Sequence, residues 1–134
     1  MAAFATTFTL GIGPAHAEQR LQGTWRMHCM DDSKTVQAWG RLEGSGRPYA
    51  RHKLRISLME MAADGRAPFI MVQVFNRDGS LTNYRKRYVH GGKGRMKTWN
   101  TTVQSRKGID TLSFYATSRN GVQSRSCTDE LPRR

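Results

Sequence analysis

A basic stretch without acidic residues is the part of this sequence whose residue types and spacing most clearly suggest chemistry. No Asp or Glu lies between Asp78 and Asp110, whereas Lys and Arg recur there with Tyr and Trp between them. A sheet face that carries cations and stacking rings is how single-stranded nucleic acid is held. The same surface would hold a sulfated glycan, the phosphates of a lipopolysaccharide or an acidic protein. The candidate binding residues are Tyr84, Arg85, Lys86, Arg87, Tyr88, Lys93, Arg95, Lys97, Trp99, Arg106 and Lys107.

These residues would form one surface only if the strands that carry them were neighbours. In an extended strand Arg85 and Arg87 face one way, whereas Lys86 faces the other. Pairing of two consecutive strands within residues 81–104 predicts a hairpin with one coherent basic face. The alternative is a solvated basic surface without a dedicated partner, because Lys and Arg on strands also deter edge-to-edge aggregation.

Histidines are the candidate catalytic residues of this sequence. His28, His52 and His90 are the candidate acid–base groups of a secreted ribonuclease, in which imidazoles move the proton of the 2′-hydroxyl and Arg holds the phosphate. Nothing in their spacing indicates such a site, and the chain has no nucleophile-elbow, phosphate-loop or dinucleotide-binding motif. Two cysteines without a Cys-x-x-C pair make a poor metal site. We therefore expect a binding protein without metal or cofactor rather than an enzyme.

Composition favours an anionic partner for one small domain. The chain has 134 residues, with 22 Lys and Arg against 10 Asp and Glu, for a formal net charge of +12. This length allows one domain, and no apolar run is long enough to cross a membrane as a helix. The charge favours binding to nucleic acid, an anionic membrane or acidic glycans.

The sequence pattern predicts that these residues lie on short strands separated by regularly spaced turns. Leu54, Ile56 and Leu58 alternate with polar residues, which is the period of a strand. Asp64-Gly65 and Asn120-Gly121 are typical of tight hairpin turns. The predicted strands are 23–30, 34–43, 49–61, 69–76, 81–90, 95–104, 109–118 and 122–128. The fold class we expect is all-β, a single antiparallel domain of about eight strands, as a barrel or a sandwich.

Two cysteines near the ends of the predicted domain favour its closure by a disulfide. Cys29 and Cys127 would pair in an oxidising compartment, and a loop of this length contributes about 4–5 kcal/mol. Cys127 is out of phase with Val122, which predicts a bulge or an irregular last strand. The alternative is two free thiols in a cytosolic protein.

The first residues are typical of an export signal. Residues 1–17 carry no Lys, Arg, Asp or Glu and end in Ala15-His16-Ala17, which indicates a secretory signal peptide followed by a β domain over 18–134. The alternative is an N-terminal strand that packs into the core. Export to the periplasm or out of the cell makes nucleic acid a less favoured partner. It favours an anionic envelope or host polymer, an anionic lipid or an acidic protein instead.

A short motif suggests a second function. Leu21-Gln22-Gly23-Thr24-Trp25 resembles the first strand of calycins, the lipocalin and avidin barrels. This resemblance implies a barrel interior that holds a small apolar ligand, whereas the alternative is a packed core with Trp25, Trp39 and Trp99. The spacing of Trp25 and Cys29 also resembles small periplasmic proteins of the invasion-associated locus B type. We expect an exported basic β protein that binds an anionic surface or ligand, with an apolar-ligand carrier and a ribonuclease as alternatives.

Overall fold

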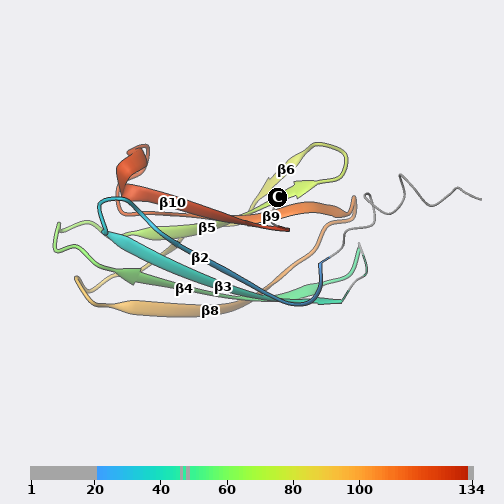
Figure 1. The fold of residues 1–134 in the computed structure, drawn as a ribbon, viewed down its shortest axis with the longest axis horizontal. Helices are drawn as coiled ribbons and strands as arrows, with labels where there is room; N and C mark the ends of the chain where they lie inside the picture. Colours follow the sequence, from blue (N-terminus) through green and yellow to red (C-terminus); the bar gives the residue numbers. More distant parts are fainter. Residues whose placement is uncertain (1–20, 46, 48, 133–134) are drawn as a thin grey trace, which may run out of the picture.

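Two antiparallel sheets make up the part of the chain that the computed structural model describes, residues 21–45, 47 and 49–132 (Figure 1). The first sheet has the strand order β2-β3-β4-β8, and the second has the order β10-β9-β5-β6, with β7 also paired to β5. The first sheet contains β2 (Gln22–Met30), β3 (Val36–Ser45), β4 (His52–Glu60) and β8 (Met96–Val103). The second contains β5 (Phe69–Asn76), β6 (Leu81–Asn83), β7 (Arg87–Tyr88), β9 (Ile109–Thr117) and β10 (Ser126–Leu131).

The predicted all-β antiparallel fold is confirmed, and its two layers form a sandwich (Figure 1). The predicted leader, residues 1–17, lies outside the described residues. In the described part of the chain no helix is long and apolar enough to span a membrane.

The core lies between the sheets, where the predicted period of two places the apolar side chains. Leu54, Ile56 and Leu58 on β4 are at most 1% exposed. They share the interior with Val72 and the other inward residues of β5. At Gly40 on β3, a Cβ atom would lie 2.9 Å from Cε of Met27 and 3.1 Å from Cε2 of Phe114 on the opposite sheet. The two layers are therefore in close contact at this point of the core.

One side of the sandwich is closed where β2 meets β10. Cys29 and Cys127 form the predicted disulfide, with their Cα atoms 5.8 Å apart. The backbone N–H of His28 donates a hydrogen bond of 2.8 Å to the Asp129 carboxylate. The irregularity predicted before Cys127 is confirmed too, because a 3-10 helix, η2 (Gln123–Arg125), precedes β10 and moves the start of the strand to Ser126.

The opposite side is built differently from the prediction. The prediction of a hairpin within residues 81–104 is wrong, because β6 and β7 pair with β5 whereas β8 pairs with β4. The backbone explains this arrangement: Tyr84 N–H donates to Val72 O at 2.9 Å, and Val89 N–H donates to Pro68 O at 3.0 Å. Residues 81–89 therefore follow β5 along their length. We call the side of the sandwich between β7 and β8 the open side.

Candidate anion-binding face

Three arginines lie side by side on the outer face of the first sheet. Arg26 on β2 pairs in register with Arg41 on β3, and Arg41 pairs with Arg55 on β4. Directly opposed residues share one face of a sheet, with their Cβ atoms about 5 Å apart. All three side chains are exposed. We call the surface formed by this row and its neighbours His28 and Trp39 the arginine face.

The row is unusual because like charges directly opposite each other destabilise a sheet. A charge row that costs stability is more easily explained by binding than by folding. Glu43 lies beside the row, with its Oε2 3.5 Å from Nη2 of Arg41. Both of those side chains are about half exposed, so the ion pair is weak and leaves most of the positive field in place. The face thus keeps a net positive charge.

Aromatic rings lie one row further along the strands. His28 pairs in register with Trp39, and their ring centroids are 5.8 Å apart at an angle of 49°. The Gln37 amide Nε2 lies 2.8 Å from Nε2 of His28 and fixes the position of the imidazole. Trp39 is half-buried and Ser57 follows it across the same row on β4. A flat indole ring beside cations is a stacking platform for a planar or cyclic ligand group.

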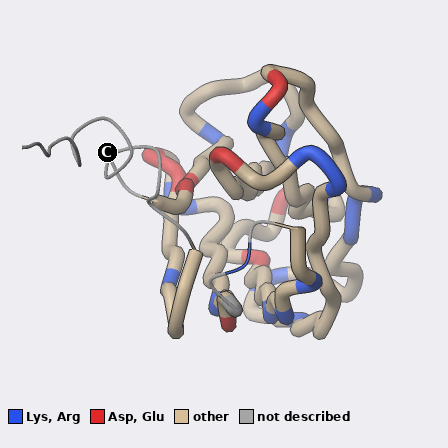
Figure 2. Tube along the Cα trace, turned by 90° about the vertical axis from the view of Figure 1, so that its right-hand side faces the viewer, with Lys and Arg blue, Asp and Glu red and all other residues tan. Residues whose placement is uncertain are grey.

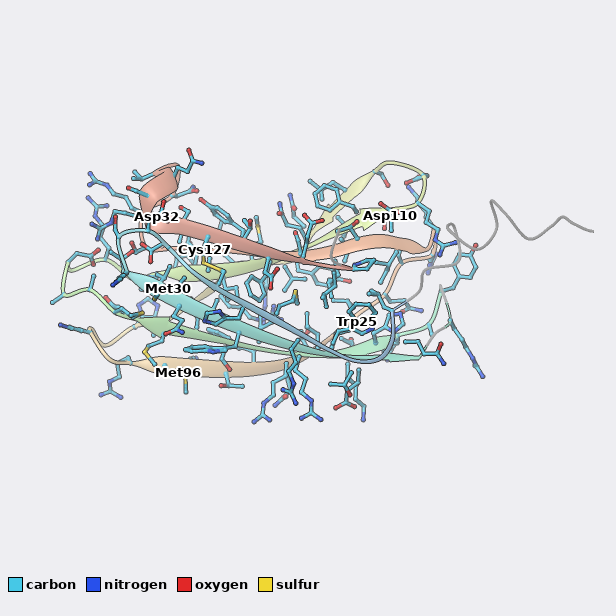
Figure 3. The ribbon with its side chains drawn as sticks, viewed as in Figure 1. Trp25, Met30, Asp32, Met96, Asp110 and Cys127 are labelled. Atoms are coloured by element: carbon cyan, nitrogen blue, oxygen red, sulfur yellow. A yellow bond between two sulfur atoms is a disulfide. The ribbon has the colours of Figure 1, made fainter. Side chains whose placement is uncertain are left out.

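Two hollows flank the central arginines on this face. One of about 440 Å³ lies over the aromatic side of the row, and one of about 600 Å³ lies on its far side. Arg41 and Arg55 line both hollows. The first is lined by Arg26, Met27, His28, Trp39, Gly40, Arg41, Arg55 and Ser57, and the second by Arg41, Glu43, Lys53, Leu54, Arg55, Asn100, Thr101 and Thr102. In Figure 3, nitrogen-tipped side chains project outward from the layer that contains β3 and β4.

A methionine-rich row borders the arginine face at one end of the sheet. Met30, Gln37, Met59 and Met96 lie in one register row across the four strands. Met30 is 40% exposed and Met96 is 54% exposed, and both lie at the same end of the first sheet (Figure 3). The outer face therefore changes from apolar to aromatic to basic along the strands.

The residues predicted as the binding surface are dispersed over several surfaces. The Nζ atom of Lys86 lies 4.7 Å from the Phe69 ring centroid. The rings of Tyr88 and His90 stack with their centroids 6.0 Å apart. Both contacts lie beside the second sheet. Lys107 forms an ion pair of 2.9 Å with Asp78 in a different turn region.

The other residues of the predicted binding surface lie at the open side or in loops. Tyr84, Arg87 and Trp99 lie at the open side, where Tyr84 and Trp99 pack against the core. Lys97 lies 5.6 Å from the Trp99 ring centroid. Arg85, Lys93, Arg95 and Arg106 are exposed in the loops before β7, before β8 and before β9. Figure 2 shows that Lys and Arg occur in both layers and in the loops. The role of this set in binding stays a prediction.

The arginine face itself was missed by reasoning from the sequence. Its cations come from three strands that alternate inward apolar and outward polar residues, so each one reads as an ordinary exposed position. A usable signal was present in the pattern, because Arg26, Arg41 and Arg55 all occupy outward positions next to inward hydrophobic residues. What the sequence lacks is the register that aligns them.

The three candidate catalytic histidines lie in three different places. His28 is on the arginine face, His52 is 2% exposed on the inner side of β4, and His90 is exposed beside Tyr88. Burial lowers the pKa of His52 from its ordinary value of 6.5. The described residues contain no group of three or more His, Cys, Asp or Glu placed to hold a metal ion. The arrangement brings no pair of these histidines together for proton transfer.

Comparison of the chain with protein-family models, with curated proteins and with solved structures gives no match.

Proposed function

We propose that this protein binds a polyanionic glycan, one that carries sulfate or phosphate groups, through the arginine face. The observation that carries the proposal is the register of Arg26, Arg41 and Arg55 on three adjacent strands. Strands lie about 4.8 Å apart, so the row spans about 10 Å across the sheet. Guanidinium groups bind sulfate and phosphate oxygens in a bidentate manner, and a fixed row of them fits a ligand with several such groups.

The aromatic row and the hollows extend this recognition from charge to shape. Trp39 and His28 offer ring surfaces on which the apolar face of a sugar ring packs. The hollows on both sides of Arg41 and Arg55 give room for the rings that connect the anionic groups. The net charge of +12 adds long-range attraction, which raises the rate of encounter with a polyanion.

The expected export of the chain favours a glycan rather than a nucleic acid as the ligand. A disulfide between Cys29 and Cys127 is typical of proteins that work outside the reducing cytoplasm. The uncharged residues 1–17 support export as well. Outside the cell or in the periplasm, anionic glycans of envelopes and surfaces are the polyanions that a basic protein meets. The carrier and ribonuclease hypotheses stay predictions, and the described residues supply no observation that favours either of them.

Two matched triple variants test the proposal. R26Q/R41Q/R55Q removes three charges from the arginine face, and R85Q/K93Q/R106Q removes three exposed charges from the sequence-predicted set. Exposed ion pairs contribute up to about 1 kcal/mol each, so the first variant is expected to bind a heparin oligosaccharide about 10- to 100-fold more weakly. Titration calorimetry at low salt measures the dissociation constants.

The control variant distinguishes a site from general charge. It has the same net charge as the first variant and is expected to lose less than about threefold in affinity. Equal loss in both variants, or a larger loss in the control, would overturn the arginine face as the binding site. A circular dichroism spectrum and a melting curve for each variant confirm that its fold is intact.

A further inference from the structure

A buried guanidinium on the open side lacks the acceptors that it needs. Arg87 faces inward, because it pairs in register with Ile70, a residue of the core. Its Nη2 donates a hydrogen bond of 3.3 Å to Oγ1 of Thr101 on β8. Its Nε and Nη1 are buried and have no hydrogen-bond partner among the residues that the structure describes. Burial lowers the pKa of Arg87, and the charge of Arg85 lowers it further.

Unmet donors on a buried cation are costly, and a carboxylate is the group that best satisfies them. A buried charge without its counter-ion destabilises a protein by several kcal/mol. A carboxylate has two oxygens with the spacing of adjacent guanidinium N–H groups, so it accepts from Nη1 and Nη2 together or from Nε and Nη2 together and satisfies one of the two unpaired nitrogens. Residues 79–109, which include both β7 and β8, contain no Asp or Glu.

The strand beside this guanidinium has a free edge. In the described chain β8 pairs with β4 alone, and β7 pairs with β5 alone. Tyr84 covers the far end of β8, where its hydroxyl lies 3.2 Å from the backbone N of Gln104 and accepts its hydrogen bond. The backbone groups of β8 that point away from β4 are therefore available before that point, and an extended segment pairs with such an edge.

We propose that the open side binds an extended acidic segment of a partner protein, which adds to the edge of β8 and places a carboxylate on Arg87. A residue directly opposite Thr101 on an added antiparallel strand shares the inward face of Thr101, so a Glu at that position points toward the guanidinium of Arg87. Lys97 and Trp99 lie on the same inward face of β8 and would contact its neighbours on the added strand. The flanking Arg85 and Lys86 are exposed and attract an acidic segment. This site is separate from the arginine face, which lies on the outer side of the first sheet.

A pair of synthetic peptides tests the site. One is a capped seven-residue peptide of alternating Val and Thr with a central Glu, and the other carries Gln at that position. We expect the Glu peptide to bind the protein at least about tenfold more tightly than the Gln peptide, because only the carboxylate satisfies the buried cation. Hydrogen exchange is expected to slow at those amides of β8 that do not face β4.

Variants place the effect at Arg87 and separate it from the proposed function. R87Q is expected to abolish the preference for the Glu peptide, and R106Q, which removes one exposed positive charge from the loop before β9, is expected to keep it. The R26Q/R41Q/R55Q variant is expected to bind the Glu peptide as the wild type does, whether or not it binds heparin. Equal binding of both peptides by the wild type, or no binding of either at millimolar concentration, would overturn the proposal. Should R87Q unfold, the wild-type comparison of the two peptides still decides.

Discussion

The disulfide is expected to be the largest single contribution to stability on the closed side of the sandwich. Cys29 and Cys127 are separated by 98 residues, so the cross-link ties the first strand of one sheet to the last strand of the other. In the loop-entropy description, closing a loop of about 100 residues stabilises the fold by about 4.7 kcal/mol. For a domain of this size a change of 1 kcal/mol shifts the melting temperature by about 4 °C. Removal of the cross-link should therefore lower it by about 15–20 °C.

The C29A/C127A variant measures this contribution, because alanine is smaller than cysteine and fits both positions without strain. Thermal and urea unfolding followed by circular dichroism give the change in the free energy of unfolding. The wild type treated with a reductant should match the variant, and the reductant should leave the variant itself unchanged. A loss below about 1 kcal/mol would refute the reasoning, since it would mean that the unfolded chain gains little freedom when the cross-link is cut.

Two further predictions concern buried polar groups. The Asp31 carboxylate accepts hydrogen bonds from the backbone N–H groups of Thr35 and Val36 at 2.7 and 2.9 Å. D31A should therefore lower the free energy of unfolding in urea by about 2–4 kcal/mol. The control D32A, at an exposed neighbouring position, should change it by less than about 0.5 kcal/mol. Similar losses in the two variants would contradict the role of Asp31. Burial lowers the pKa of His52 below 6.5, so the unfolded chain takes up the proton first and stability should fall as the pH decreases from 6.5 toward the folded value. The H52Q variant should show a shallower fall in the same window by thermal melts, and an unchanged pH profile would rule out His52 as the cause.

The fold was predictable where local pattern determines the structure. The alternation of Leu54, Ile56 and Leu58 identifies both the strand and its inner face, because a period of two leaves one arrangement that buries all three. The pairing of Cys29 with Cys127 followed from there being two cysteines near the ends of the predicted domain. The first inference uses the pattern within one segment, and the second uses the number and positions of the cysteines.

The neighbours of each strand were not predictable by the same reasoning. Residues 81–90 looked like half of a hairpin, but the long apolar edge of β5 offered them a better partner. The arginine face depends on that kind of information, since Arg26, Arg41 and Arg55 meet only when β2, β3 and β4 pair in one register. Charge density along the chain pointed instead to residues 84–107, which the fold distributes over several surfaces.

The most direct test of the central claim is a map of the backbone amides that respond to a polyanion. A ¹⁵N-labelled sample is titrated with a heparin oligosaccharide of defined length, and amide chemical shifts are followed by NMR. The arginine face predicts that the largest shifts occur in β2, β3 and β4 around Arg26, Arg41 and Arg55, with the indole N–H of Trp39 among them. Largest shifts in residues 84–95 or 104–107, or on the outer side of the second sheet, would contradict it.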